Sequence, residues 1–221
     1  MLSACSAVEN KEEMKKGLLF VVSGPSGTGK TTLCRAMTQV LPGLHYSISY
    51  TTRPPRPGDE NGREYHFVSP DEFQEMIDRN DFAEWAEIYG CKYGTSQPHL
   101  EKIRREGRAV ILDIDGNGAR QLKNKDVAGT FIFLLPPSLA ELRRRLSLRG
   151  TEGRAAMEER LKKAQEELIA ARWYDYLIIN DDLEKAKERL KAVILAEHQR
   201  RVRMEETLDR LLTEKLNYEP L

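Results

Sequence analysis

The sequence has few cysteines, no long apolar run and no excess of charge of either sign. Cys5, Cys34 and Cys91 lie far apart, without metal-ligand or redox spacing, so we expect reduced thiols in a cytoplasmic protein. No apolar run approaches the roughly 18 residues that a membrane-spanning helix needs. Basic and acidic side chains number 35 each, which argues against binding nucleic acid or an anionic membrane through overall charge. Any anion must therefore be bound by a local cluster.

The two ends of the chain differ in character from its middle. The start, MLSACSAVENKE, lacks the basic and apolar regions of a signal peptide, so we expect residues 1–16 to be a flexible leader. Met14 begins MKKGLLF, which raises the hypothesis that translation starts there. Residues 17–198 form the predicted domain, and 199–221 form a C-terminal helical extension. Its leucines would pack on the same chain or on a second copy, so a monomer and a homo-oligomer both remain open.

Short apolar runs alternate with helical stretches along the domain. The run at 18–23, LLFVVS, precedes a glycine-rich loop and a helix. Further apolar runs occupy 109–115, 130–135 and 176–180, and helical patterns occupy 96–106, 138–148, 154–172 and 182 onward, with 183–216 read as one long helix. The runs are continuous rather than alternating, as in strands covered on both faces. This order predicts an α/β fold of the P-loop NTPase type, a parallel sheet flanked by helices.

Two segments depart from this alternation. Residues 47–95 hold a turn-rich stretch and short aromatic runs, which predicts a small mixed-β region inserted in the domain. Residues 143–160, RRRLSLRGTEGRAAMEER, are rich in arginine and interrupted by glycine. Such a segment is a candidate helical lid.

A phosphate-binding loop follows the first strand. The pattern G-x-x-x-x-G-K-T spans eight residues: Gly24, Pro25, Ser26, Gly27, Thr28, Gly29, Lys30 and Thr31. Glycines let backbone N–H groups surround phosphate, and the helix N-terminus adds partial positive charge. Lys30 would reach the β- and γ-phosphates, and the Thr31 hydroxyl would ligate Mg²⁺. The loop predicts an ATP site without identifying the acceptor.

Two aspartates, Asp113 and Asp115, end the second buried strand. A carboxylate at the end of a strand neighbouring the phosphate loop can complete the Mg²⁺ shell. We assign Asp113 to that role together with Thr31. The alternative for either aspartate is a cap on the helix that follows.

The turn-rich stretch carries a candidate anion grip. Arg53 and Arg56 stand three residues apart on a loop stiffened by prolines, and Tyr65 follows on the adjoining strand. Stiffening lowers the entropy lost when the guanidinium groups bind. The set suits a phosphate monoester held from several sides.

With these residues in place, the sequence resembles the guanylate kinase family. The resemblance runs from about Gly17 to Glu197 through S-x-S-x-T-T-R-x-P-R-x-G, Y-H-F-V, F-x-E-W-A, Y-G-T, I-L-D-I-D, R-G-T-E and I-I-N-D-D. It implies transfer of the γ-phosphoryl group of ATP to GMP with Mg²⁺. It also implies a core at 17–47 and 99–198, a GMP-binding region at 48–98 and a lid at about 143–160.

The resemblance also implies roles for individual residues. The phosphate of GMP would be held by Arg53, Arg56 and Tyr65, with Tyr93 nearby. Guanine would be read by Glu84, with the Ser49 and Thr95 hydroxyls at its O6 edge, and Asp115 is assigned to the same site. Lid arginines at the transferring phosphoryl would be Arg145, Arg149 and Arg160, which join Lys30 and Arg56 as the catalytic set. Asp59, where glutamate is commoner in the family, is given no role.

Three rival functions are weighed against this one. A peptide-binding scaffold module of the same fold typically lacks residues equivalent to Lys30, Arg53 or Arg56. A GTPase needs N-K-x-D, whereas residues 124–127 read NKDV. A kinase for AMP, a ribose bisphosphate or a pyrimidine monophosphate is the nearest enzymatic rival, against which Glu84 argues.

Overall fold

The computed structural model describes residues 16–149 and 154–216. Its larger sheet has five strands in the order β2-β7-β1-β8-β9, and every neighbouring pair is parallel. The strands are β1 (Leu19–Ser23), β2 (Leu44–Tyr46), β7 (Ala109–Asp113), β8 (Thr130–Leu135) and β9 (Tyr176–Ile179). The predicted parallel sheet is confirmed. β2 was not predicted, because its three residues, LHY, are too short to give a pattern.

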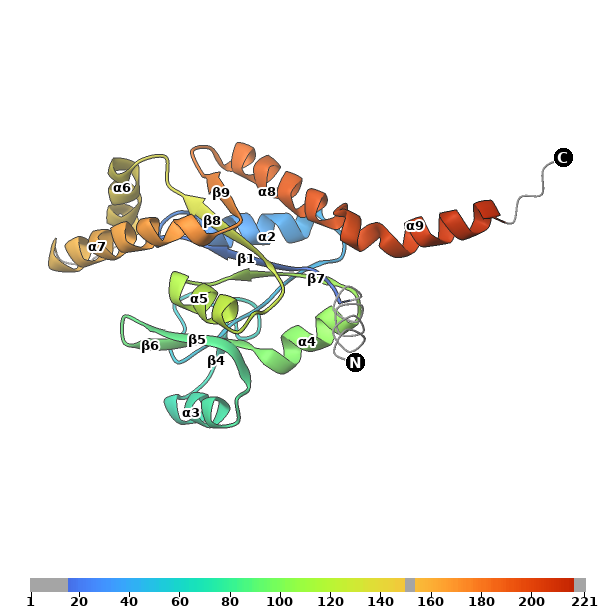
Figure 1. Ribbon diagram of the computed structural model, residues 1–221. Helices are drawn as coiled ribbons and strands as arrows, with labels where there is room; N and C mark the ends of the chain where they lie inside the picture. The colour runs from blue at the N-terminus through green and yellow to red at the C-terminus, as the bar shows by residue number, and fades with distance from the viewer. Residues whose placement is uncertain (1–15, 150–153, 217–221) are drawn as a thin grey trace.

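Helices cover both faces of this sheet (Figure 1). One face packs against α2 (Lys30–Val40) and α8 (Leu183–His198), the other against α4 (Gln97–Arg105), α5 (Gly116–Asn124) and the 3-10 turn η1 (Ala171–Trp173). Alternate residues of β1 belong to opposite cores: Phe20 and Val22 to the first, Leu19 and Val21 to the second. Since side chains alternate along a strand, a strand buried on both faces must be apolar throughout.

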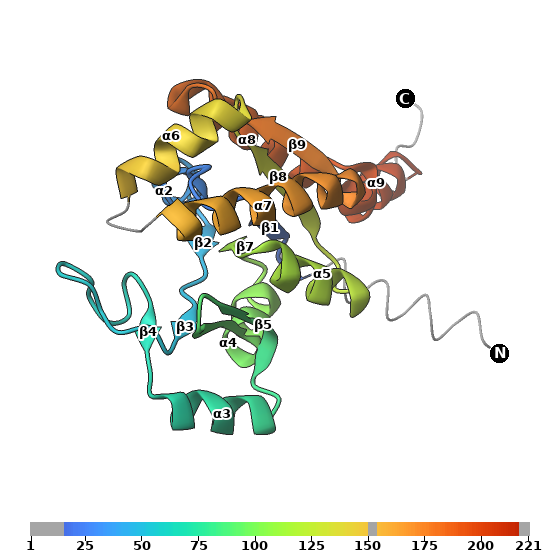
Figure 2. The same cartoon turned by 90° about the vertical axis from the view of Figure 1, so that its left-hand side faces the viewer.

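The second sheet is small and mixed, in the order β4-β3-β6-β5. It comprises β3 (Tyr50–Thr51), β4 (His66–Phe67), β5 (Phe82–Ile88) and β6 (Cys91–Ser96), with α3 (Pro70–Asp78) beside it (Figure 2). β3 pairs parallel with β4 and antiparallel with β6. The sequence analysis expected the mixed β structure but missed α3. A capping box joining Ser69 and Glu72 starts this helix, with Pro70 in its first turn, and this start signal was present in the sequence.

The remaining helices are α6 (Leu139–Arg149), α7 (Arg154–Ala170) and α9 (Arg201–Leu216). The predicted single helix at 183–216 is wrong, because the chain bends between α8 and α9 at Gln199 and Arg200. There the Gln199 N–H bonds to the Ala196 carbonyl, and Arg203 donates to the Lys16 carbonyl at 2.8 Å. Contacts with the body thus redirect the chain where no glycine or proline marks an end. α9 extends away from both sheets (Figure 1).

Some predictions fall on segments that the structure leaves out. The expected leader, apart from Lys16, lies outside the described residues, as do residues 150–153 of the expected lid and the last five residues of the extension. Across 16–149 and 154–216, no helix combines the length and the apolar character needed to cross a bilayer.

Candidate functional site

The phosphate loop connects β1 to α2. Gly24 has φ 143°, and a Cβ there would lie 2.4 Å from the Leu134 carbonyl oxygen, so only glycine fits against β8. The Lys30 ammonium folds over the loop, donating to the Gly24 carbonyl at 2.8 Å. The Thr28 hydroxyl donates to the Pro25 carbonyl at 2.7 Å. The loop is therefore closed on itself, with its lysine already inside the curve of the backbone.

Asn180 supports this loop from the end of β9. Its side-chain amide donates to the Thr28 carbonyl at 2.7 Å, and its backbone N–H bonds to the Leu135 carbonyl at 2.9 Å. The side chain is buried. The sequence analysis quoted this asparagine only as part of I-I-N-D-D. The available signal was its position, since a polar residue ending a buried parallel strand faces the loops at that edge of the sheet.

Thr31 and Asp113 meet beside the loop. The Thr31 hydroxyl donates to Asp113 Oδ2 at 2.5 Å, because β7 runs parallel to β1 and brings Asp113 opposite Val22. The two residues assigned to Mg²⁺ are thus in contact, and their role as metal ligands stays a prediction. Two oxygens of this kind, near a phosphate loop and open to solvent, are ligands that suit Mg²⁺.

Asp115 lies two residues further on and caps α5. Its Oδ1 accepts from the Gly118 N–H at 2.8 Å. Its Oδ2 is buried and has no hydrogen-bond partner within the part of the chain that the structure describes. A buried carboxylate oxygen is costly without a donor. Asp115 Oδ1 thus caps α5, and Asp115 Oδ2 is available to accept a hydrogen bond from a ligand.

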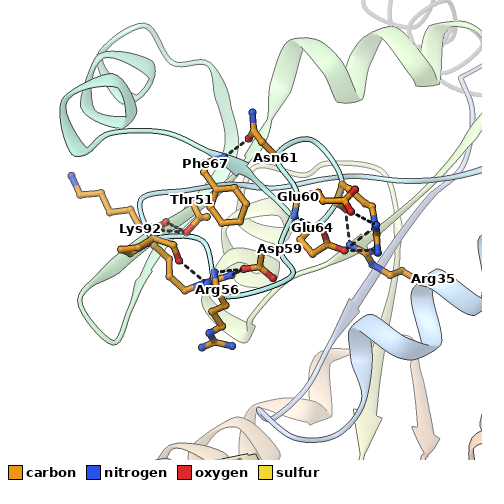
Figure 3. Close-up of polar contacts among 12 residues, drawn as sticks. Arg35, Thr51, Arg56, Asp59, Glu60, Asn61, Glu64, Phe67 and Lys92 are labelled. Carbon is orange, nitrogen blue, oxygen red and sulfur yellow. Dashed lines mark hydrogen bonds and ion pairs between the residues drawn. The ribbon is translucent and has the colours of Figure 1, made fainter.

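A carboxylate organises the loop of the two arginines. Asp59 Oδ2 accepts from the Arg53 guanidinium at 2.8 Å and from the Arg56 backbone N–H at 2.9 Å. Those two bonds, the Arg56 N–H first, hold the pKa of Asp59 below its ordinary value. The Arg56 guanidinium extends from the loop away from Asp59 (Figure 3). Asp59, which was given no role because glutamate is commoner at its position, thus orders this loop through one side-chain and one backbone contact.

The aromatic residues of the region pack around Arg53. Its guanidinium lies 5.3 Å from the centre of the Tyr65 ring, and Tyr65 packs edge-on against Tyr93 at 5.7 Å. Burial raises the pKa of the Tyr65 hydroxyl. Ser49 accepts the His66 N–H at its carbonyl, 2.9 Å away. Four of the predicted GMP-site residues thus lie on, or within two residues of, the neighbouring strands β3, β4 and β6.

Glu84 is a buried carboxyl group on β5. Only 3% of the residue is exposed, and its Oε1 accepts from the Thr95 hydroxyl at 2.5 Å across the β5–β6 pair. Burial raises its pKa to about 7, opposed by the Thr95 hydrogen bond and assisted by the charge of Asp115. The glutamate is therefore largely shielded from water, which suits its carboxylate to accept hydrogen bonds from a ligand.

The predicted lid arginines have different surroundings. Arg145 donates to Glu141 Oε1 at 2.8 Å and to the Asn180 carbonyl at 3.0 Å, which ties it to the residue supporting the phosphate loop. Arg160, on α7, lies 4.9 Å from the centre of the Tyr89 ring at the β5–β6 turn. Arg149 ends α6, and its side chain lies outside the described part of the chain. The structure thus brings Arg145 to the loop and Arg160 to the second sheet.

Comparison with known proteins gives one consistent result. The sequence model of the guanylate kinase family matches residues 16–197. The guanylate kinase of Geobacter sulfurreducens is 50% identical over 190 residues, 86% of this chain and 94% of the relative. That of Geobacter metallireducens is 48% identical over 194 residues, 88% and 96% of the two chains. A crystal structure of guanylate kinase from Anaplasma phagocytophilum aligns with a TM-score of 0.75 and 31% identity, covering 93% of this chain and 98% of that one.

Proposed function

The chain belongs to the guanylate kinase family, and we propose that its phosphate loop binds ATP while its second sheet binds GMP. The protein is a nucleoside monophosphate kinase that transfers the γ-phosphoryl group of ATP to GMP in purine nucleotide metabolism. The observation that carries the site assignment is the buried pair of Glu84 and Thr95. We also propose that it acts in the cytoplasm, where both nucleotides are present.

Glu84 reads the base in this proposal. An ionised carboxylate accepts from guanine N1–H and N2–H₂ together, whereas adenine presents a lone pair at N1 and no amino group at C2. Leaving a buried polar group unpaired supports discrimination on the order of 10⁴-fold. The hydroxyls of Ser49 and Thr95 serve the O6 edge, and the buried Oδ2 of Asp115 accepts a further donor from GMP.

The phosphate of GMP is held by Arg53, Arg56, Tyr65 and Tyr93. This assignment is supported by the contacts of Arg53, because Asp59 and the Tyr65 ring hold its guanidinium in place before any ligand binds. Arg56 is fixed at its backbone while its guanidinium stays extended from the loop (Figure 3). A preordered grip loses less conformational entropy on binding.

The chemistry needs no general base. The second pKa of a phosphate monoester is about 6, so the attacking oxygen of GMP is ionised at neutral pH. The remaining barrier is repulsion between two anions and the loss of water, which positioned cations overcome. Lys30, Arg56, Arg145, Arg149 and Arg160 are the proposed cations around the transferring group, which passes directly and in line to GMP.

Thr31 and Asp113 are the residues that fit a Mg²⁺ ion. Their oxygens lie 2.5 Å apart at the mouth of the phosphate loop, and hard oxygen donors are what Mg²⁺ prefers. When bound with ATP, the ion supplies charge neutralisation to the phosphates. The protein's own part is to keep both oxygens oriented toward that position.

The test of the base site compares the same substitution, Glu to Gln, at two positions of β5. Glu84→Gln removes one acceptor and presents an N–H group to guanine, so we expect the KM for GMP to rise about 10- to 100-fold, the worth of a hydrogen bond to a charged group. Glu87→Gln, on the same strand but exposed, should leave it unchanged. The assay couples ADP release to absorbance, with GMP, dGMP, AMP, UMP and CMP as acceptors.

Two results would contradict the proposal. An unchanged KM for GMP in the Glu84 variant would remove this residue from the base site. Equal rates with GMP and AMP in the parent protein would mean that the buried carboxylate does not select the base.

A further inference from the structure

The helix α5 lies against the free edge of β5, the strand that carries Glu84 (Figure 1). β5 pairs with β6 on one side only, and such an edge strand leaves backbone N–H and C=O groups on its other side without strand partners. What covers that edge therefore controls where β5, and with it Glu84, can sit.

Side chains of α5 and of its C-cap residue bind the backbone of β5 on both sides of Glu84. The Gln121 amide donates to the Trp85 carbonyl at 2.6 Å and accepts from the Trp85 N–H at 3.2 Å. The Lys125 ammonium donates to the Ala83 carbonyl at 2.8 Å. The residues before and after Glu84 are thus both held by the helix, by contacts to backbone groups.

Gly118 makes room for the carboxylate itself. A Cβ at this position would lie 2.2 Å from Glu84 Oε2 and 2.9 Å from Glu84 Cδ, far inside van der Waals contact. The φ angle of Gly118 is not positive, so the backbone conformation at this position would accept alanine. Alanine is the better helix former, but only glycine at this position leaves space for the Glu84 carboxylate.

Gly118 and Gln121 lie on one face of α5, since residues three apart in a helix are neighbours, and Lys125 is the C-cap residue that directly follows the helix. The same helix begins at Asp115, two residues after Asp113. One rigid element therefore connects the end of β7, beside the phosphate loop, to the strand that carries Glu84.

We propose that Gly118 and Gln121 on this face of α5, with Lys125 at its C-cap, set the position of the Glu84 carboxylate and thereby the selectivity for guanine. The three are positioning residues and act through Glu84 and its strand. The inference depends on the role proposed above for Glu84. It assigns part of the base selectivity to residues outside the nucleotide site.

The first experiment compares the same substitution at two glycines of α5. Gly118→Ala forces the carboxylate aside, and a misplacement of about 1 Å costs on the order of 10²-fold in catalytic efficiency. We therefore expect kcat/KM for GMP to fall about 100-fold, with a higher KM for GMP, while the KM for ATP stays within about twofold. Gly116→Ala is the control, because a Cβ there would meet only Glu167 Cγ at 3.8 Å. It should leave both constants and the melting temperature unchanged.

A rescue variant separates positioning from general damage. In Gly118→Ala, the further change Glu84→Asp shortens the side chain by one methylene and relieves the contact with the new methyl group. We expect the double variant to bind GMP more tightly than Gly118→Ala alone, although Glu84→Asp weakens GMP binding in the parent. Additive losses in this double-mutant cycle would overturn the proposal.

Gln121→Ala tests the same idea without adding volume. It should raise the KM for GMP about tenfold and reduce the preference for GMP over AMP, whereas Asn124→Ala, exposed on the same helix, should do neither.

A parallel loss of ATP and GMP affinity with a lower melting temperature would mean a purely structural role. If Glu84→Gln raises the KM for GMP while Gly118→Ala and Gln121→Ala do not, only this inference fails. If Glu84→Gln has no effect, the site assignment fails first.

Discussion

At the scale of single residues, burial of the Glu84 carboxyl group lowers the free energy of unfolding at neutral pH, and we propose that it is retained for GMP binding. Its pKa is raised to about 7 by burial, above the ordinary value of 4.5 that the unfolded chain keeps. Between these two pH values the folded protein holds a proton that the unfolded chain has lost. Stability therefore falls as the pH rises from 4.5 to 7, and above 7 the full cost remains.

This linkage makes a prediction about Glu84→Gln. A gap of about 2.5 pKa units corresponds to about 3 kcal/mol, so the variant should gain two to three kcal/mol relative to the parent on going from pH 5 to pH 8. Urea unfolding at the two pH values measures the difference. Glu87→Gln, exposed on the same strand, should show no such change. An equal stability difference for the Glu84 variant at both pH values would contradict the raised pKa.

Some site residues can be predicted from their own chemistry, and others cannot. Lys30, Thr31 and Asp113 follow from a motif whose spacing is fixed by phosphate and metal geometry, and the Thr31 to Asp113 contact is observed. Asp59, Asn180 and Gly118 were missed because they contact backbone atoms or leave space for another residue. Such roles depend on the partner's position, which only the folded structure provides.

At the scale of elements, the long buried strands could be predicted and the short or bent segments could not. β1 and β8 are apolar apart from Ser23 at the end of one and Thr130 at the start of the other, because both of their faces are covered. β2 has only three residues, and the bend between α8 and α9 has no glycine or proline. Tertiary contacts, such as Arg203 with the Lys16 carbonyl, decide these features.

The phosphate loop is an element that depends on a neighbouring strand. Asn180 binds the Thr28 carbonyl from the end of β9, so Asn180→Asp would place a buried charge against a carbonyl oxygen and remove the donor. We expect the KM for ATP to rise about tenfold and the free energy of unfolding to fall by about 1–3 kcal/mol. The adjacent Asp181→Asn, whose carboxylate pairs with Arg189 at the surface, should change neither by a comparable amount. An Asn180 variant with normal ATP kinetics would show that the loop keeps its shape without β9.

At the scale of the whole molecule, the order of motifs predicted a core and an inserted mixed-β region. The contacts between the core and that region could be found only from the folded structure. Arg35, on α2 of the core, reaches the loop of the second sheet. It donates to the Arg63 carbonyl at 2.6 Å and to Glu64 Oε1 at 3.3 Å (Figure 3). Arg160 of α7 approaches Tyr89 at the far end of the same sheet. Neither contact has a sequence signal, because the partners are far apart in the chain and belong to different motifs.

The Arg35 contact should influence GMP binding more than folding. It joins the core to the loop that carries Arg53 and Arg56, so its loss leaves the loop freer, and GMP must then order it at a cost of about 1.4 kcal/mol, the lower range for a hydrogen bond from a charged group. Arg35→Gln should therefore raise the KM for GMP about tenfold, with the KM for ATP within about twofold. Arg79→Gln is the matched control, because its ion pairs with Glu75 and Asp81 stay inside the inserted mixed-β region. If both variants bind GMP as the parent does, the contacts of Arg53 with Asp59 and Tyr65 order the loop without Arg35, and the core does not contribute to GMP binding through this contact.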